Sequence, residues 1–212
     1  MTYTQWKECL DARVDRLTPK AALAFGLSCA ERLFPNYLGF VRVNNWGDPD
    51  AIRSSLDAGW TYLTSSRLPD QDWIEAGLSG CETAAPDTEV FSVLASPALD
   101  SAASAYCILD FLQSKNRRSM AELSRLAMDT VDMHIRQKLW EEHRESIKSP
   151  EDMDAFSKME RQAVGRHFLF LREQRHQEET VDLLEGESVD FEEWKSRWRL
   201  VPVSSIGVPR LA

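Results

Sequence analysis

Apolar residues recur along most of this chain at the spacing of an α-helix. Ile52, Leu56 and Trp60 follow one another at intervals of four residues, and a longer apolar series keeps that interval across residues 123–139. An interval of three or four residues places side chains on one face of a helix. Residues 90–94 carry the pattern of a short strand but have no partner strand, so an extended segment or short helix is expected there. The pattern therefore predicts an all-α protein.

Helix starts are marked by capping side chains. Serine, threonine and aspartate accept hydrogen bonds from the free N–H groups of a first helical turn, and proline is tolerated at its first position. Ser119 and Asp190 are each followed three residues later by glutamate, which is the pattern of a capping box. Four further helices are predicted to begin where a capping residue directly precedes proline, at Thr18, Asp48, Ser96 and Ser149.

Two long helices have ends that the sequence also indicates. Proline inside a helix removes a hydrogen bond and clashes with the preceding turn, so Pro35 is expected to end the apolar helix that begins near residue 19. Residues 37–43 would then form a short helix or a turn. Near the other end of the chain, an apolar row over residues 156–170 predicts one last long helix. The polar residues 172–180 that follow are expected to project into solvent or to fray.

The chain has the size and composition of one globular domain. Its 212 residues are enough for one sizeable core, and 43% of them are hydrophobic and 28% charged. The capping and periodicity signals together indicate about seven to nine helices. This number of helices in one domain predicts a single multihelical bundle over residues 1–200. Residues 201–212 hold two prolines and one glycine and are expected to form an extended tail.

The charge of the chain is negative and unevenly distributed. The formal net charge is -9, and residues 141–193 account for all of it with sixteen acidic and seven basic side chains. Phosphate groups are bound by basic surfaces, so this balance argues against nucleic acid as a partner. The densest acidic run contains no lysine or arginine and comprises Glu178, Glu179, Asp182, Glu185, Glu187, Asp190, Glu192 and Glu193.

Neither a secretory signal nor a membrane span is recognisable in the sequence. The first residues mix charged and apolar side chains, and the apolar runs are far shorter than the roughly 20 residues needed to cross a bilayer. The sequence therefore predicts a cytoplasmic protein that does not associate with membranes. In a reducing cytosol its four scattered cysteines are expected to be free thiols, with Cys29 and Cys107 buried in apolar helices.

No familiar catalytic or cofactor-binding motif occurs in the chain. Gly-rich phosphate loops and the serine nucleophile elbow are missing. The histidines form two pairs, His134 with His143 and His167 with His176, and each pair is nine residues apart on one predicted helix. That spacing puts the two side chains on opposite faces, about 13 Å apart along the helix. Neither a metal nor a cofactor is therefore expected, and His134 is expected to be a half-buried core residue.

Two carboxyl groups lie within otherwise apolar helical stretches. Glu31 is followed directly by Arg32, and Asp100 lies in the helix expected to begin at Ser96. A catalytic acid or base needs a shifted pKa in a cleft, so these residues are the candidates for an enzyme of unrecognised type. The alternative that we favour is that Glu31, Arg32 and Asp100 pair with one another between two core helices.

Several segments together resemble a known family. They are residues 24–40, Trp46-Gly47-Asp48 with Leu56 and Trp60, Pro86-Asp87-Thr88 with Phe91, and residues 96–100. In order, they are similar to the bacterial YjaG-like family, a domain of unknown function, over roughly residues 20–175. The most specific string is Glu31-Arg32-x-x-Pro35-Asn36-Tyr37. The resemblance implies an all-helical fold and no activity or cofactor, with a set of shared polar residues: Glu31, Arg32, Asn36, Tyr37, Asp48, Asp87 and Asp100.

The function that the sequence favours is a protein-binding module without enzymatic activity. A more specific prediction is an immunity-type inhibitor that neutralises a toxin, such as a basic nuclease. This role suits an acidic protein because an acidic surface speeds association with a basic partner. The surface would be the acidic run, with three aromatic anchors, Phe191, Trp194 and Trp198. Two alternatives stay open: the enzyme described above, and a housekeeping adaptor or homodimer that buries the two tryptophans against a second copy.

Overall fold

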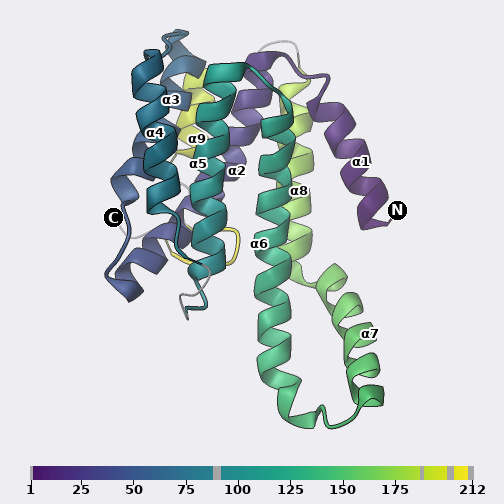
Figure 1. Ribbon diagram of the computed structural model, residues 1–212. Helices are drawn as coiled ribbons and strands as arrows, with labels where there is room; N and C mark the ends of the chain where they lie inside the picture. The colour runs from purple at the N-terminus through teal and green to yellow at the C-terminus, as the bar shows by residue number, and fades with distance from the viewer. Residues whose placement is uncertain (1, 88–91, 187–188, 200–202, 210–212) are drawn as a thin grey trace.

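The computed structural model describes residues 2–87, 92–186, 189–199 and 203–209 (Figure 1). Within these ranges the chain forms nine α-helices and one short 3₁₀ helix, and its only strand-like pairing is a single bridge between Val203 and Pro209. This confirms the predicted all-α bundle. The elements are α1 (Tyr3–Val14), α2 (Pro19–Asn44), α3 (Pro49–Ser65), α4 (Gln71–Ala84), α5 (Ala95–Ser114), α6 (Arg118–His143), η1 (Arg144–Ser146), α7 (Pro150–Arg166), α8 (Phe168–Leu184) and α9 (Phe191–Trp198).

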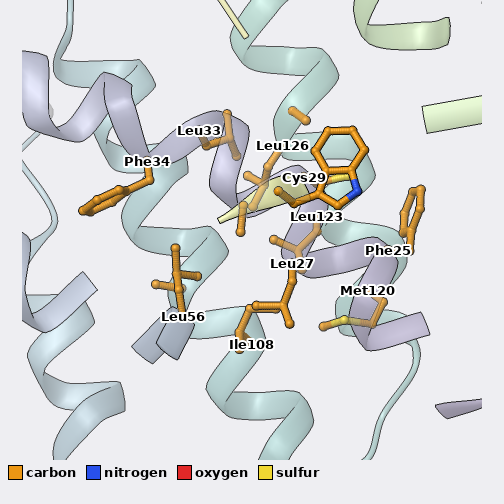
Figure 2. Close-up of a cluster of buried hydrophobic side chains, with 14 of the residues drawn as sticks. Phe25, Leu27, Cys29, Leu33, Phe34, Leu56, Ile108, Met120, Leu123 and Leu126 are labelled. Atoms are coloured by element: carbon orange, nitrogen blue, oxygen red, sulfur yellow. The ribbon is translucent and has the colours of Figure 1, made fainter. Parts of the chain in front are cut away.

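Helix α2 lies at the centre of the bundle because apolar or small side chains cover nearly its whole circumference. Nineteen of its 26 residues are buried, and it packs against α3, α5, α6, α8 and α9. Figure 2 shows part of this core, in which Leu27 of α2 points toward Ile108 of α5. Gly59 of α3 permits the close approach there, since a Cβ at this position would lie 2.7 Å from Ile108 and 2.9 Å from Leu27.

The prediction that Pro35 ends this helix is wrong. Helix α2 continues through Pro35 to Asn44, and its C-cap Asn45 adopts a left-handed conformation with φ of 51°. A proline inside a helix costs about 3 kcal/mol, but Leu33 and Phe40 on either side of it are fully buried. Burial of two such side chains offsets that cost, at roughly 1.5–3 kcal/mol each. Residues 37–43 are therefore the continuation of α2.

Four of the six predicted N-caps are confirmed, and two are wrong. The confirmed N-caps, whose side chains accept backbone N–H groups of α2, α3, α7 and α9, are Thr18, Asp48, Ser149 and Asp190. Helix α5 begins one residue before Ser96, and α6 begins one residue before Ser119. Ser119 Oγ instead donates a hydrogen bond to the carboxylate of Asp110 in α5, so a contact between helices takes the place of the cap.

The last long helix of the prediction is two helices. Extended backbone at His167 (φ -69°, ψ 136°) separates α7 from α8, and His167 Nδ1 accepts from the backbone N–H of Leu169 at 3.2 Å. Residues 172–180 form the middle of α8 and do not project into solvent as predicted, because Glu173, Gln177 and Thr180 are buried. Helix α7, η1 and the adjoining end of α6 form an arm that extends away from the other helices (Figure 1).

The tail that the sequence predicts as extended turns back on itself over its described residues. The Ser204 backbone N–H donates to the carbonyl oxygen of Val208 at 2.8 Å, and Gly207 takes the positive φ (88°) that a tight turn requires. The Ser205 N–H donates to the carbonyl oxygen of Arg32 at 2.9 Å. The tail is thereby held against α2.

Two further expectations concern local segments and membranes. Residues 90 and 91 of the segment predicted as a short strand or helix lie outside the described residues, and residues 93 and 94 form a turn before α5. Within the described ranges, no helix is both long and apolar enough to cross a membrane.

Candidate functional site

Glu31 is a fully buried carboxylate that joins α2 to α3. Its two oxygens accept from Arg53 Nη1 and Nη2 at 2.9 and 2.7 Å, and Oε1 also accepts from Trp60 Nε1 at 2.7 Å. Arg53 forms a further ion pair with Asp57 at 3.0 Å, and Asp57 accepts from Arg199 at the end of α9. A buried charge needs such partners, so Glu31 is occupied in holding α2, α3 and α9 together.

Arg32 faces a different side of α2 and forms a second buried network. Its Nε and Nη2 donate to the two oxygens of Glu173 in α8 at 3.1 and 2.7 Å. Gln177 donates to Glu173 at 3.0 Å and accepts from Ser124 of α6 at 2.6 Å. Burial acts to raise the pKa of Glu173, but the charge and hydrogen bonds of Arg32 outweigh it and the pKa is lowered. The ionised pair therefore ties α2, α6 and α8 together.

Asp100 belongs to a third group on α5 and α6. Thr130 Oγ1 donates to Asp100 Oδ2 at 2.5 Å. Burial raises the pKa of Asp100 to about 6, against the opposing effect of the Thr130 hydrogen bond. The favoured expectation that Glu31, Arg32 and Asp100 pair with one another is wrong. Neighbouring helix positions point about 100° apart, so Glu31 and Arg32 meet different helices.

Three other residues that the family resemblance singles out, Asn36, Tyr37 and Asp48, hold segments of backbone together, and Asp87 lies at an exposed position. Tyr37 Oη donates to a backbone carbonyl oxygen at the end of α4 at 2.6 Å and accepts from the Asp48 N–H at 3.0 Å. Asp48 in turn caps α3. Asn36 is completely buried, and its Nδ2 lies 3.5 Å from Ser205 Oγ in the tail. Tyr37, Asp48 and Asn36 thus fix α3, α4 and the tail on α2.

The acidic run divides into carboxylates that are paired within the chain and others that are exposed. On α8, Glu178 accepts from Trp6 Nε1 at 2.6 Å, and Asp182 and Glu185 accept from Arg13 at 2.5 and 2.6 Å. The Arg13 hydrogen bond lowers the pKa of Glu185. These contacts attach α1 to α8, so part of the predicted partner surface is used within the chain.

The aromatic residues predicted as anchors lie mostly inside the molecule. Trp194 is buried, and its Nε1 donates to a carbonyl oxygen of α2, that of Ala24, at 3.2 Å. Trp198 is only 8% exposed, and its ring centroid lies 5.2 Å from the guanidinium carbon of Arg32. Phe191 is half-buried at the start of α9. The two tryptophans therefore join α9 to α2 within this chain.

Two carboxylates of the acidic run line a hollow between α8 and α9. Six residues line this hollow, whose volume is about 180 Å³: Leu183, Val189, Asp190, Glu193, Trp194 and Arg197. Glu193 and Asp190, which caps α9, are the two carboxylates of this lining, and Glu179 and Glu192 are further exposed carboxylates of α8 and α9. Glu187 lies outside the described residues. Apolar walls and carboxylates therefore meet at one place on the surface.

A second cavity, of about 200 Å³, lies between the tail, α8 and α9. Its lining comprises Arg32, Arg172, Glu173, His176, Trp198 and the tail residues 203–205. Arg172 Nη2 donates to the carbonyl oxygens of Ser204 and Ser205 at 3.1 and 2.8 Å. The Arg172 guanidinium thus holds the tail over the cavity.

The sequence prediction ends the apolar stripe at residue 171 and therefore misses the buried roles of Glu173 and Gln177. Steps of three and four residues from Phe170 lead through Glu173, Gln177 and Val181 to Leu184, and all five side chains are buried. Polar residues inside such a periodic row indicate a buried polar network, because buried polar groups require partners. The signal for this network was present in the spacing.

Among the described residues, no group of three His, Cys or acidic side chains could hold a metal ion. Burial raises the pKa of Cys29 to about 11 and that of Cys107 to about 12. Both are therefore uncharged thiols at neutral pH. Cys107 and Cys81 line a mostly apolar cleft of about 350 Å³ between α4, α5 and α6. His134 is half-buried, as predicted.

The described helices, arranged around α2, define this chain as an all-α bundle protein. Residues 10–208 match the family described as protein of unknown function (DUF416), and the chain belongs to that family. Two chains of solved structures match. One is the crystal structure of a DUF416 family protein from Shewanella baltica OS155 at 1.91 Å resolution, with 20% sequence identity and a TM-score of 0.74, over 94% of this chain and 98% of that chain. No match is found among curated proteins.

The family match confirms the predicted membership of a helical family of unknown function. The similarity to the Shewanella baltica protein, at 20% identity, concerns the fold alone.

Proposed function

We propose that this chain is a protein-binding module without enzymatic activity, and that its partner is a protein with a basic surface. The observation that carries the proposal is the hollow between α8 and α9, where apolar walls adjoin carboxylates. Lysine and arginine side chains combine an apolar stem with a charged end. Such a side chain from the partner would lay its stem against Leu183 and Trp194 and place its charge near Asp190 and Glu193.

The charge around the hollow supports a basic partner. Arg13 neutralises part of the acidic run on α8, but Glu179, Glu192 and Glu193 remain exposed. Arg197 also lines the hollow, with its guanidinium carbon 5.9 Å from the ring centroid of Trp194. Exposed charges of one sign raise the rate of association with an oppositely charged partner, and salt screens the effect.

More specifically, we propose that the partner is a toxin, such as a basic nuclease. This chain would then be an immunity-type inhibitor that neutralises the toxin. An acidic surface suits this role because it occupies the basic surface with which such an enzyme holds its negatively charged substrate. We also propose that the chain belongs to the YjaG-like part of the family and that it is located in the cytoplasm.

Of the two alternatives, the adaptor or homodimer keeps a specific supporting observation. Trp140 and Met153 on the arm are 42% and 40% exposed, and exposed apolar side chains are common at protein interfaces. A dimer through Trp194 and Trp198 has less support, because both side chains are buried within one chain. An enzyme built on the buried carboxylates has also lost support, since they lie in separate networks.

Charge reversal at the hollow tests the proposal. Glu192→Lys combined with Glu193→Lys changes two exposed carboxylates of α9, of which Glu193 lines the hollow, and the matched control Glu141→Lys with Glu142→Lys changes two adjacent exposed carboxylates on α6. Tagged wild-type and control proteins are expected to retain the same basic protein from a lysate of the source cells. The E192K/E193K variant is expected to bind that protein about tenfold more weakly.

Titration of the purified partner then measures the affinity at low and high salt. Wild type and control should lose affinity as salt rises, because exposed charges are screened. Growth of cells that produce the partner with and without this chain tests the inhibitor form, and rescue of growth by the chain is expected. Undiminished binding by E192K/E193K, or an equal loss in both double variants, would contradict an acidic binding surface.

A further inference from the structure

Helix α7 carries a stripe of four exposed charged residues whose sign changes halfway along the helix. In chain order the stripe consists of Glu151, Asp154, Lys158 and Arg161. Intervals of three, four and three residues place the four side chains on one face of the helix. None of them forms an ion pair with another described residue. Their charges are therefore available for contacts outside the chain.

The order of these charges is complementary to a second copy of the same helix. Positions 151 and 161 are symmetric about residue 156, and so are positions 154 and 158. If two α7 helices pair antiparallel about a two-fold axis at residue 156, Glu151 faces Arg161 of the second copy. Asp154 then faces Lys158 of the second copy, and the symmetry repeats both contacts. In a parallel pair, by contrast, like charges would face each other.

The arm as a whole has the same division of charge. Its tip, residues 141–154, holds six acidic and two basic side chains, a net charge of -4. Its root, residues 136–140 and 155–166, holds five basic side chains and one acidic side chain, a net charge of +4. An antiparallel pair of arms places the tip of each arm against the root of the other. The attraction between opposite charges therefore favours this direction of pairing.

Apolar side chains exposed on the arm can supply the affinity of such a pair. Met133 and Trp140 of α6 are 53% and 42% exposed, and they lie about two turns apart on one face of the helix. The Trp140 ring packs against Phe156, the residue at the centre of the stripe, so Trp140 lies near the middle of the arm. Exposed ion pairs alone contribute little free energy, whereas tryptophan is enriched among the residues that dominate protein interfaces.

We infer that the arm is a dimerisation element that packs antiparallel against the arm of a second copy of this chain. Two helical hairpins then form one four-helix bundle. Helix α7 buries only two of its 17 side chains within its own chain, and helices in proteins are stabilised mainly by the packing of one face. The second arm provides the packing that α7 lacks.

This dimer is separate from the proposed binding of a basic protein. The hollow includes Leu183, next to the last residue of α8, whereas α7 adjoins the first residue of that helix. The arm extends away from the other helices (Figure 1). A dimer joined through the arms therefore leaves a hollow accessible on each copy, and the two proposals stand independently.

Sedimentation equilibrium of the whole chain tests the dimer. Wild type is expected to be a dimer at micromolar concentrations and to dissociate more readily as salt screens its charges. Glu151→Lys with Asp154→Lys makes the stripe entirely positive. Lys158→Glu with Arg161→Glu makes it entirely negative. Each double variant is expected to dimerise about tenfold or more weakly, because like charges then face each other.

Two further combinations test the antiparallel direction. The quadruple variant E151K/D154K/K158E/R161E has a stripe of reversed sign that is again complementary to itself, so it should regain the dimer. An equal mixture of the two double variants should form a heterodimer, detected by native mass spectrometry. Glu151→Lys also opposes the helix dipole of α7. A dimer regained by the quadruple variant could therefore not come from a more stable helix.

The control is E192K/E193K, which reverses two exposed charges on α9 and should dimerise as wild type does. All changed positions are exposed, and circular dichroism should show wild-type helix content in every variant. A wild-type protein that stayed monomeric at concentrations of about 100 μM, well above the micromolar range, would overturn the inference. So would a dimer that neither double variant weakens, or a quadruple variant that stays monomeric. Loss of the basic partner by E192K/E193K with the dimer intact would concern the hollow alone.

Discussion

At the scale of single residues, buried carboxyl groups differ in whether an arginine lies against them. Glu173 is paired with Arg32, and its pKa is lowered although it is buried. Asp100 accepts a hydrogen bond from the hydroxyl of Thr130, and its pKa is raised to about 6. The two side chains therefore make the stability of the fold depend on pH in opposite directions.

Asp100→Asn is expected to stabilise the protein at neutral and alkaline pH. The ordinary pKa of aspartate is 3.8 and the folded-state value is about 6, so the folded state binds the proton more tightly and the ionised form is unfavourable. Removal of the charge should raise the free energy of unfolding by about 2 kcal/mol near pH 8. Asparagine can still accept from Thr130.

The pH dependence separates this effect from a change in packing. As the pH falls from about 6 to 4, wild-type Asp100 becomes protonated in the folded state and the protein gains the same stability. The difference between D100N and wild type should therefore disappear near pH 4, as measured by urea denaturation across the range. A difference that stayed constant from pH 8 to pH 4 would rule out the charge as its cause.

At the scale of helices, the sequence predicts what depends on neighbours in the chain. The caps Thr18 and Asp48 are confirmed because each side chain reaches N–H groups within three residues of it. Pro35 was expected to end a helix on the same local reasoning, but burial on both of its sides decides the outcome. Ser119 fails as a cap because its hydroxyl donates to Asp110 on another helix.

The candidate sites depend even more on distant contacts. The Arg32–Glu173 pair joins positions 141 residues apart, and the cavity beside it combines α2, α8, α9 and the tail. No local pattern specifies which arginine meets which carboxylate. The sequence did identify Glu31, Arg32 and Asp100 as unusual polar residues in apolar helices, but it did not supply their partners.

Helix α1 provides a prediction at this scale, because polar contacts hold it to α8. Arg13→Gln removes the ion pairs with Asp182 and Glu185, which are partly exposed and contribute about 1 kcal/mol or less. We expect faster hydrogen exchange in α1, with little change in the free energy of global unfolding. Arg16→Gln, an exposed position near the end of the same helix, is the control. An effect of R13Q that did not weaken in high salt would argue against an ionic attachment of α1.

At the scale of the whole molecule, the buried apolar contacts are unevenly distributed. Helix α2 buries nineteen of its 26 residues, whereas α7 buries only Phe156 and Val164. Phe156 packs edge-on against Trp140 of α6, with ring centroids 5.8 Å apart, in the arm that extends from the body (Figure 1). Regions with few buried apolar contacts open locally at a lower free energy than the core.

Phe156→Ala is therefore expected to release the arm and leave the body folded. Truncation of a buried phenylalanine costs about 3–5 kcal/mol, which is a large loss for a helix that buries two side chains. In hydrogen exchange followed by mass spectrometry, amides of α7 should lose their protection while those of α2 and α5 keep wild-type rates. Met153→Ala changes a side chain that is 40% exposed on the same helix and should leave both regions unchanged. Loss of protection in α2 to the same extent as in α7 would instead mean that the arm and the body unfold as one cooperative unit.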